Sequence, residues 1–291
     1  MTVNFNKKRQ GMILVLVAGI CWGLIGLPVR ALSGMGLGAF DITALRAAFT
    51  GLALLTVVPA INPKAMKIRL RDLWCMAGCG LASVTLFNIC YFATIQRTSI
   101  GIAVILLYTS PIFVTVLSHF CFGESIKKTT AIALVLVIIG CVLVSGVLDN
   151  DGGGLSLPSL LTGLGSGLCY ALYSIFGRYA QQRGYSSIAI TFWAFIFAGT
   201  AALFLLDWQT TLPILRTASP WLPLTSLVLV STIIPYCAYT AGLRLLPPST
   251  AAITATIEPV VGTLVGIIAF GETLTWGTLA GMALIIGALF L

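Results

Sequence analysis

The residues most able to do chemistry in this sequence lie inside apolar stretches, where two of them directly precede prolines. Glu258 precedes Pro259, and Ser110 precedes Pro111. A carboxylate inside a membrane helix marks a functional site by default, so Glu258 is a candidate to bind substrate or to exchange a coupling proton. The alternative is a structural carboxylate bonded to a neighbouring helix. Pro111 and Pro259 lack a backbone donor, so we predict that they interrupt their helices and serve in gating.

Aromatic and polar side chains recur at positions that predict a lined cavity. Asn88 and Tyr91 are three residues apart and are expected to share a helical face. Trp22 and Tyr170 lie in mid-stretch, where each ring either faces a cavity or packs against neighbours. The predicted substrate-binding residues are Trp22, Asn88, Tyr91, Ser110, Tyr170, Tyr236, Tyr239 and Glu258. Their rings, hydroxyls and single carboxylate suit a small neutral or zwitterionic organic solute better than an inorganic ion.

Arg46 is expected about one turn inside the second apolar stretch, which opens near Asp41. A charge at this depth must reach the headgroups, pair with an acid or face water. Arg46 therefore either extends to the outer surface or pairs with Asp41, or it holds a substrate carboxylate. A sugar phosphate would need several such cations, because phosphate is best bound by Arg or Lys clusters. The sequence does not favour a multiply charged phosphate as substrate.

The motifs of enzymes, ATP-driven pumps and channels are absent from the sequence. It contains no HExxH, GxSxG or Walker A segment, and no charge ring or repeated filter sequence. His119 is the only histidine and lies near the end of an apolar stretch, so it supplies no nucleophile–base pair or metal cluster. We expect no catalytic residue, no metal and no cofactor. An intramembrane enzyme is the remote alternative.

The elements that must position these residues are membrane-spanning helices. Of the 291 residues, 58% are hydrophobic and 8% are charged, whereas soluble domains carry roughly 25% charged residues. A bilayer core about 30 Å thick needs about 20 apolar residues of helix. The sequence contains ten such stretches, at 11–32, 42–60, 73–95, 102–122, 129–148, 158–180, 187–206, 221–243, 249–270 and 274–291. They leave little chain for any domain outside the membrane.

The net charge of +8 is unevenly distributed, and its pattern predicts an orientation. Connections on the side of the N-terminus carry Lys7, Lys8, Arg9, Lys64, Lys67, Arg69, Arg71, Lys127, Lys128, Arg178, Arg183 and Arg244. Connections on the other side carry only Arg30, Arg97 and Arg216. By the positive-inside rule, both termini are expected in the cytoplasm. The basicity therefore indicates topology, and we expect no nucleic-acid partner.

The sequence contains an internal duplication at an offset of 148 residues. Tyr239 to Glu272 aligns without a gap on Tyr91 to Glu124, including the prolines and the terminal Phe-Gly-Glu triplets. Five spans are an odd number, so the second copy should enter the membrane inverted, as in many secondary transporters. The predicted fold is an all-α integral membrane protein with ten transmembrane helices in two five-helix inverted repeats. The predicted units are 1–146 (spans 1–5), an extracytoplasmic linker at 147–157, and 158–291 (spans 6–10).

In combination and order, these motifs resemble the EamA-type branch of the drug/metabolite transporter superfamily. The resemblance rests on the mid-helix proline and terminal Gly-Glu of both halves, on Cys21-Trp22-Gly23, on the segment from Asp41 to Arg46 and on Glu258-Pro259. It extends from about Gly11 to Leu291. The resemblance implies a ten-helix carrier in a bacterial cytoplasmic (inner) membrane, often an exporter of amino acids or related metabolites. It also implies that spans one, three, four, six, eight and nine surround the cavity, while five and ten are peripheral.

The expected function is secondary active transport of a small organic metabolite by alternating access around a central cavity. The expected substrate is an amino acid or a related zwitterionic or neutral solute, moved in the export direction. The alternative is a carrier of multiple drugs, quaternary ammonium compounds or other metabolites. Expected partners are the small-molecule substrate, membrane lipid and protons as the coupling ion. The chain is expected to act as a monomer or a homodimer.

Overall fold

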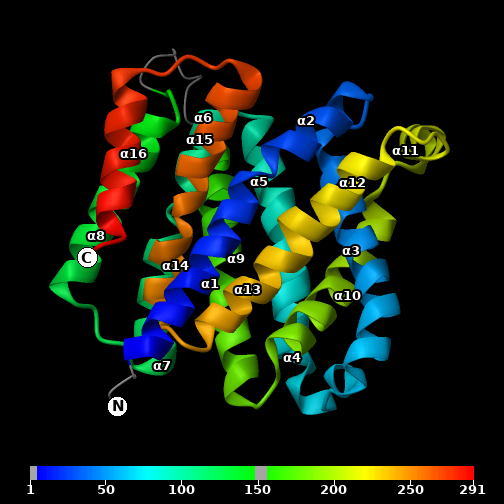
Figure 1. Cartoon of the computed structure of the whole chain (residues 1–291), viewed down its shortest axis with the longest axis horizontal. Helices are drawn as coiled ribbons and strands as arrows, with labels where there is room; N and C mark the ends of the chain where they lie inside the picture. The colour runs from blue at the N-terminus through cyan, green and yellow to red at the C-terminus, as the bar shows by residue number, and fades with distance from the viewer. Residues whose placement is uncertain (1–4, 148–155) are drawn as a thin grey trace.

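The computed structural model describes residues 5–147 and 156–291, and all regular elements in these ranges are helices (Figure 1). The predicted linker at 147–157 falls almost entirely outside the described residues. In chain order the elements are α1 (Phe5–Gly23), α2 (Gly26–Gly34), α3 (Ala39–Ile61), η1 (Pro63–Met66), η2 (Leu70–Asp72), α4 (Leu73–Ala77), η3 (Gly78–Leu86), α5 (Phe87–Ile95), α6 (Ile100–Leu107), α7 (Ser110–Phe122), α8 (Lys128–Val144), α9 (Leu157–Gln182), α10 (Ser187–Leu205), α11 (Trp208–Leu215), α12 (Trp221–Val228), η4 (Leu229–Ile233), α13 (Ile234–Leu243), α14 (Pro248–Ala255), α15 (Ile257–Phe270) and α16 (Trp276–Ala288). Of these, η1 and η2 are 3₁₀ turns, and η3 and η4 are π-helical.

Eight helical stretches within the described residues are long and apolar enough to cross a bilayer. They are Asn6–Gly34, Ala39–Ile61, Leu70–Ile95, Ile100–Phe122, Leu157–Gln182, Ser187–Leu205, Trp221–Leu243 and Pro248–Phe270. Helices α8 and α16 lie where the fifth and tenth spans are predicted, but they have only 17 and 13 residues. At 1.5 Å per residue they extend about 26 Å and 20 Å, less than a bilayer core. Over its described residues the chain is an all-helical, multi-pass membrane protein with eight candidate spans and two shorter apolar helices.

Helices from the two halves of the chain pair across the bundle. α8 packs along α16 at one edge, and α3 packs along α10 at the opposite edge (Figure 1). Between these edges, α1 packs against α13, α14 and α15, while α9 packs against α5, α6 and α7. Each set of neighbours maps onto the other when residue numbers are shifted by 148. The middle of the bundle is therefore built from α1, α9 and two broken spans, α6–α7 and α14–α15.

The two broken spans are interrupted at equivalent residues. α6 ends at Leu107 and α14 ends at Ala255, shortly before α7 and α15 begin. A proline removes the hydrogen bond to the carbonyl four residues earlier, and its ring crowds that carbonyl. Leu107 and Ala255 are the residues four positions before Pro111 and Pro259. Each break thus lies one turn before its proline, which is tolerated in the first turn of the next helix.

The broken spans also end in the same way. Gly123 and Gly271 adopt left-handed conformations, with φ of 67° and 69°. The backbone N–H of the next residue, Glu124 or Glu272, donates to the carbonyl six residues earlier, at 3.3 Å and 3.2 Å. This is a Schellman-type cap, and glycine reaches the positive φ without steric cost. The Phe-Gly-Glu triplets therefore stop both helices, α7 at one end of the bundle and α15 at the other (Figure 1).

Two π-helical segments widen the helices that carry the predicted binding residues. Shifted by 148 residues, η4 falls within η3. Hydroxyls satisfy carbonyls five residues back in both segments: Ser83 Oγ donates to Gly78 at 3.0 Å, and Thr232 Oγ1 donates to Leu227 at 2.8 Å. Such π segments often lie near functional sites. Here they immediately precede α5 and α13, which hold the predicted Asn88, Tyr91, Tyr236 and Tyr239.

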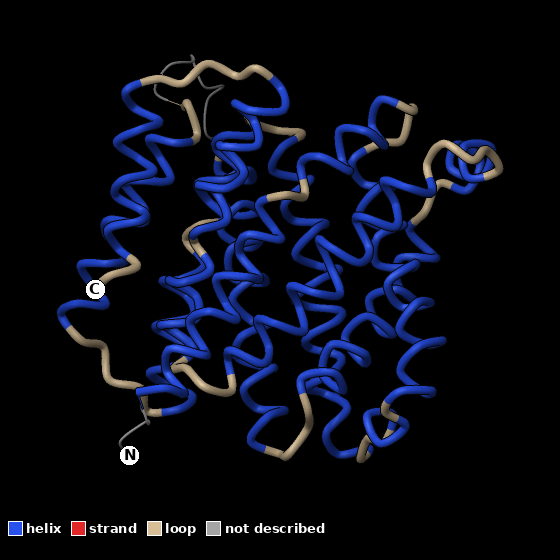
Figure 2. Tube along the Cα trace, in the orientation of Figure 1, coloured by secondary structure: helices blue, strands red, loops and turns tan. Residues whose placement is uncertain are grey.

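The connections gather at the two ends of the bundle (Figure 2). One end carries the N-terminus, the α3–α4 segment, the α7–α8 and α13–α14 connections and the α9–α10 turn (Figure 1). We name it the basic end, because these segments contain Lys7, Lys8, Arg9, Lys64, Lys67, Arg69, Arg71, Lys127, Lys128, Arg183 and Arg244. The other end, named the opposite end, carries α2, α11 and the α5–α6 connection.

Candidate functional site

A small cavity lies in the middle of the bundle, between the two helix breaks. Its walls come from α6–α7, α9, α13 and α14–α15. Its volume is about 10 Å³, room for about one water molecule. The lining residues are Tyr108, Ser110, Pro111, Val114, Tyr170, Ser174, Tyr239, Ala252, Ala255, Thr256 and Glu258. An organic solute can enter this space only if the surrounding helices move apart.

Glu258 is the acidic residue of this cavity. It is the second residue of α15, directly after the break, and its partly exposed surface faces the cavity. The Tyr170 hydroxyl donates to Glu258 Oε2 at 3.5 Å, and Tyr108 lines the same cavity. The first turn of a helix has unpaired N–H groups and the positive end of the helix dipole, which favour a carboxylate. The break therefore provides the position that accommodates this charge within the bundle.

Four aromatic rings form a wall beside Glu258. The Trp22 ring centroid lies 5.4 Å from Tyr236, 5.5 Å from Tyr239 and 6.4 Å from Tyr170. These separations and their tilted or edge-on geometry are those of favourable aromatic pairs. Tyr170 and Tyr239 line the cavity, whereas Trp22 and Tyr236 pack behind them and are each 7% exposed. The structure thus places Tyr170 at the cavity and Trp22 in the packing behind it.

Hydroxyl–hydroxyl hydrogen bonds join α9 to α13 along this wall. Ser174 Oγ and the Tyr239 hydroxyl are 2.6 Å apart, and the Tyr173 hydroxyl and Thr240 Oγ1 are 3.0 Å apart. Both pairs are buried, so each would leave unpaired polar groups if it separated without water. These bonds fix the positions of the two tyrosine rings relative to α9 and α13.

Arg46 is buried beside the central site and does not reach the outer surface. The residue is 8% exposed, and its Nε has no hydrogen-bond partner among the described residues. The described residues give it no ion pair, and Asp41 instead accepts the backbone N–H of Asp207 at 3.3 Å. Arg46 lies within electrostatic range of both Glu258 and Tyr236. Arg46 and Glu258 are therefore in the same part of the bundle, without a direct ion pair.

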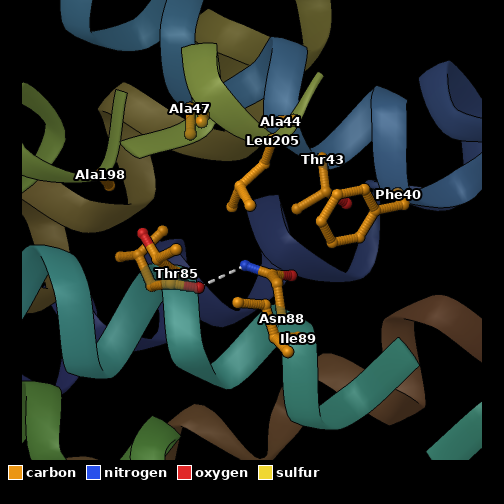
Figure 3. A pocket seen from close by; sticks show the side chains of 11 residues that line it. Phe40, Thr43, Ala44, Ala47, Thr85, Asn88, Ile89, Ala198 and Leu205 are labelled. Atoms are coloured by element: carbon orange, nitrogen blue, oxygen red, sulfur yellow. Dashed lines mark hydrogen bonds between the residues drawn. The ribbon is translucent and has the colours of Figure 1, made fainter. Parts of the chain in front are cut away.

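Asn88 lines a second pocket, away from the central cavity (Figure 3). This pocket lies between α3, η3–α5 and α10 and has a volume of about 20 Å³. Asn88 Nδ2 donates to the carbonyl four residues earlier at 2.6 Å, so part of the amide is used within its own helix. Tyr91 lies toward α9 instead: its ring centroid is 5.8 Å from that of Phe87, which in turn is 5.5 Å from that of Tyr170. Tyr91 is therefore connected to the cavity residue Tyr170 through the Phe87 ring, whereas Asn88 lines the other pocket.

Glycines let α1 and α9 approach the two breaks closely. A Cβ added at Gly19 would lie 3.0 Å from the Ala255 carbonyl oxygen, and one at Gly167 would lie 2.8 Å from the Leu106 carbonyl oxygen. A side chain at either position would force the helices apart, which is the usual reason for small residues at such crossings. Each break is therefore packed against a helix from the other half of the chain.

Three polar lining residues were not found by the sequence analysis: Tyr108, Ser174 and Thr256. Tyr108 and Thr256 are 148 residues apart, and each stands three residues before a proline. The repeat offset combined with the effect of proline on the preceding turn would have found both. Ser174 lies four residues after Tyr170 on α9, so the same-face rule for helices would have found it.

The arrangement of these groups suits reversible binding of a solute. The central site offers a carboxylate, a nearby guanidinium, several hydroxyls and aromatic faces. No group of three His, Cys, Asp or Glu side chains that could hold a metal ion occurs within residues 5–147 and 156–291. His119 is remote from the cavity: its Nδ1 lies 2.9 Å from the Glu124 carbonyl oxygen at the exposed end of α7.

Comparisons with known proteins point to transporters. The model of the EamA-like transporter family matches residues 9–146 and 157–291. An uncharacterized transporter of Archaeoglobus fulgidus is 30% identical over 290 residues, which cover 99% of this chain and 98% of that protein. The threonine/homoserine exporter RhtA of Escherichia coli K12 is 28% identical over 259 residues, covering 86% and 80%. A solved crystal structure with 18% identity has a TM-score of 0.76 over 96% of this chain and 94% of its own, and is similar in fold.

Proposed function

This chain belongs to the EamA-like transporter family, and on that premise we propose that it is a secondary active carrier of an amino acid or a related zwitterionic metabolite. The observation that carries the proposal is the small cavity between the two helix breaks, where the Glu258 carboxylate faces tyrosine hydroxyls and rings. Membrane transporters build such sites from interrupted helices near the middle of the bilayer, since the broken ends bind charged groups.

The substrate class follows from the two opposite charges of the central region. An α-amino acid carries an ammonium, which Glu258 can bind, and a carboxylate, which Arg46 can bind. Tyr170 and Tyr239 then enclose the side chain and donate hydroxyl hydrogen bonds. The relative RhtA is by name an exporter of threonine and homoserine, both small polar amino acids. This likeness supports the same substrate class here, and export as the direction.

The carrier works as two five-helix inverted repeats, with α8 and α16 as the peripheral fifth and tenth helices. Four observations support this: the two ranges matched by the family model, the equivalent breaks, the equivalent π segments and the pairing of α3 with α10 and α8 with α16. Two similar halves can exchange conformations, which gives inward-open and outward-open states of similar energy. The basic end faces the cytoplasm of a bacterial-type inner membrane, because Lys and Arg concentrate there.

Alternating access requires contacts at each end of the bundle that break in turn. At the opposite end, Arg30 pairs with Glu272 at 2.8 Å. At the basic end, Glu124 bonds to Ser249, and Arg178 donates to a backbone carbonyl of α13 at 3.0 Å. When one end of the bundle opens, the contacts at that end break while the contacts at the other end remain. Protonation of Glu258 couples this exchange to a proton gradient, since binding of a proton and of the substrate ammonium at one carboxylate are mutually exclusive.

A second candidate substrate is a quaternary ammonium compound. The observation that favours it is the wall of four aromatic rings beside a carboxylate. Aromatic faces and an acid attract a cation that has no hydrogen-bond donors. Such a ligand would need Glu258 and the tyrosines but would have no use for Arg46. The two candidates therefore differ in their dependence on Arg46.

The experiment that tests the proposal is counterflow in proteoliposomes loaded with unlabelled amino acids. A radiolabelled amino-acid mixture should accumulate, and an imposed pH gradient should change the rate. Arg46→Gln should abolish this uptake and leave any counterflow of labelled tetraethylammonium intact. Arg216→Gln, the same substitution at an exposed arginine, is the matched control and should behave as wild type.

The outcome separates the candidates. Accumulation of labelled threonine or homoserine that depends on both Arg46 and Glu258 supports the amino-acid carrier. Uptake of tetraethylammonium alone would replace it with the cation carrier. Folded protein that accumulates neither label would contradict both proposals.

A further inference from the structure

A basic pocket lies at the basic end, far from the central cavity. It is formed by the segment between α3 and α4 on one side and the α9–α10 turn on the other, and its volume is about 390 Å³. Its lining residues are Asn62, Lys64, Ala65, Lys67, Ile68, Arg69, Arg183, Gly184, Tyr185, Ser186 and Ala189. We propose that this pocket binds a phosphate-bearing anion, either the headgroup of an acidic phospholipid or a soluble phosphate compound.

The first argument is the uncompensated charge. Lys64, Lys67 and Arg69 are exposed, and none of them forms an ion pair with a described residue. Arg183 is the one pocket cation that is neutralised, because its Nε pairs with Asp72 Oδ1 at 3.0 Å. Three positive charges therefore face a concave space with no acidic residue in its lining. Lys and Arg clusters of this kind are phosphate-binding groups, and basic pockets on this side of membrane proteins bind lipid headgroups.

The second argument is that the two walls are fixed relative to each other. Asp72 is buried, and it accepts a hydrogen bond from the Tyr185 hydroxyl at 2.9 Å in addition to its pair with Arg183. The Arg69 backbone N–H donates to the same Tyr185 hydroxyl at 3.0 Å. This network joins the first half of the chain to the second across the pocket. The cations are therefore held around a preformed space, which lowers the entropic cost of binding.

The third argument is the backbone at the pocket wall. Ser186 is the N-cap of α10, a helix of 19 residues with no acidic residue in its first turn, and Ser186 Oγ accepts the Ala189 N–H at 3.2 Å. The remaining N–H groups of that turn and the helix dipole favour an anion at this place. The cations and the start of α10 thus converge on the same space.

The surroundings favour a lipid as the source of the phosphate. Exposed apolar side chains flank the basic residues: Ile61, Leu70 and Trp74, with Leu70 84% exposed. Cations next to exposed apolar side chains are typical of the membrane–water interface. An acidic phospholipid could place its phosphate in the pocket and its acyl chains along α3 and α4.

The test uses two triple variants of the full chain that lose the same charges. Lys64→Gln/Lys67→Gln/Arg69→Gln removes the pocket cations. Lys7→Gln/Lys8→Gln/Arg9→Gln removes two lysines and one arginine from the same end, outside the pocket. Retention of phosphatidylglycerol against phosphatidylcholine is measured by native mass spectrometry of the detergent-purified protein, and binding of inorganic phosphate and pyrophosphate is measured in parallel. Melting temperatures confirm that both variants are folded.

We expect phosphatidylglycerol binding to weaken about tenfold or more in the pocket variant and less than twofold in the control. Tyr185→Phe keeps every charge but removes the hydroxyl that joins the walls, and it should also weaken binding. Loss of phosphate or pyrophosphate binding with unchanged lipid retention would identify a soluble anion as the ligand. Equal weakening in both triple variants, or no weakening in the pocket variant for any ligand, would overturn the proposal. None of these outcomes depends on which solute the carrier transports.

Discussion

The broken helices α6–α7 and α14–α15 have nearly the same backbone and different chemistry. Both break one turn before a proline, and both end at a left-handed glycine followed by glutamate. After the break, however, the first half has Ser110 where the second half has Glu258. The comparison shows that proline and glycine set the backbone geometry locally, in both halves alike. A single side chain at an equivalent position then makes one of the two breaks the charged one.

The two ends of the bundle differ in a similar way. Arg30 and Arg178 are equivalent by the 148-residue offset, but Arg30 lies on α2, after an interruption that follows Gly23, whereas α9 continues unbroken to Gln182. Pro28 accounts for the interruption, because the equivalent position in α9 is Phe176. Arg30 thereby reaches Glu272 in an exposed pair, while Arg178 remains half-buried and bonds to a backbone carbonyl. Equivalent residues thus close the two ends with different contacts.

The largest expected effect comes from removing the charge that distinguishes the two breaks. Glu258→Gln should abolish the response of counterflow to a pH gradient and lower transport about a hundredfold, because losing a buried charged partner costs about 2–5 kcal/mol. Ser110→Ala, at the equivalent position, should lower transport less than about tenfold, as expected for one neutral hydrogen bond. Both are measured in proteoliposomes. A retained pH response in Glu258→Gln would remove Glu258 from the coupling mechanism.

Trp22 and Tyr170 occupy equivalent positions, but substituting them should affect different properties. A change at Trp22 should lower the stability of the protein, and a change at Tyr170 should alter its substrate preference. Trp22 is buried against Tyr236 and Tyr239, so Trp22→Ala should reduce the free energy of unfolding by about 3–5 kcal/mol. Tyr170→Phe keeps the ring and loses the hydroxyl that faces Glu258, so it should change substrate preference with little loss of stability. Thermal unfolding in detergent and competition between amino acids in counterflow measure the two effects. A large loss of stability in Tyr170→Phe would indicate that this residue, too, is mainly packing.

Replacing Pro111 or Pro259 should slow transport to a similar extent, because the two helix breaks have the same geometry. Pro111→Ala and Pro259→Ala each restore a backbone donor, which can pair with the carbonyl of Leu107 or Ala255 and make the helix continuous. One added hydrogen bond of about 1 kcal/mol should slow counterflow several-fold in both variants. Melting temperatures control for folding. Slowing in one variant alone would mean that only one break moves during transport.

The smallest expected effects are at the ends of the bundle. Arg30→Gln should lower stability by less than about 1 kcal/mol, since both partners of its pair are more than half exposed. Hydrogen exchange should speed up in α2 for this variant and in α14 for Glu124→Gln, which loses the charged contact with Ser249. Mass spectrometry after deuterium labelling resolves the two regions. Faster exchange at both ends in either variant would show that the ends are coupled and do not close independently.

The sequence predicted the family, the all-helical membrane fold and the position of the apolar stretches. It overestimated the length of two of them. The stretch predicted at 129–148 ends as a helix at Val144, because Gly146 turns the chain with φ of 65°, and the stretch at 274–291 is helical only over Trp276–Ala288. The hydrophobicity of a stretch indicates that it partitions into the membrane. The length of the helix within that stretch depends in addition on the backbone conformation at its ends. Within the described residues, eight helical stretches reach the length of a membrane span and α8 and α16 are shorter, so the predicted count of ten spans is not confirmed.

Features that depend on neighbours in the chain could be predicted from the sequence alone. The helix breaks follow from Pro111 and Pro259, and the helix ends follow from Gly123 and Gly271, because both effects act within about one turn. The concentration of Lys and Arg at one end of the bundle could also be predicted from the sequence. It requires only that alternate connections between spans lie on the same side of the membrane.

Features that depend on which helices meet were decided by the tertiary structure. Asn88 and Tyr91 are three residues apart, which places them about 60° apart around their helix, and packing sends one toward α3 and α10 and the other toward α9. Arg46 lies within electrostatic range of Glu258 and forms no pair with Asp41, and Tyr108 joins the site from the other half of the chain. Local sequence fixes where a helix bends or stops. Only the packing of distant helices fixes which side chains share a cavity, because that contact involves residues far apart in the chain.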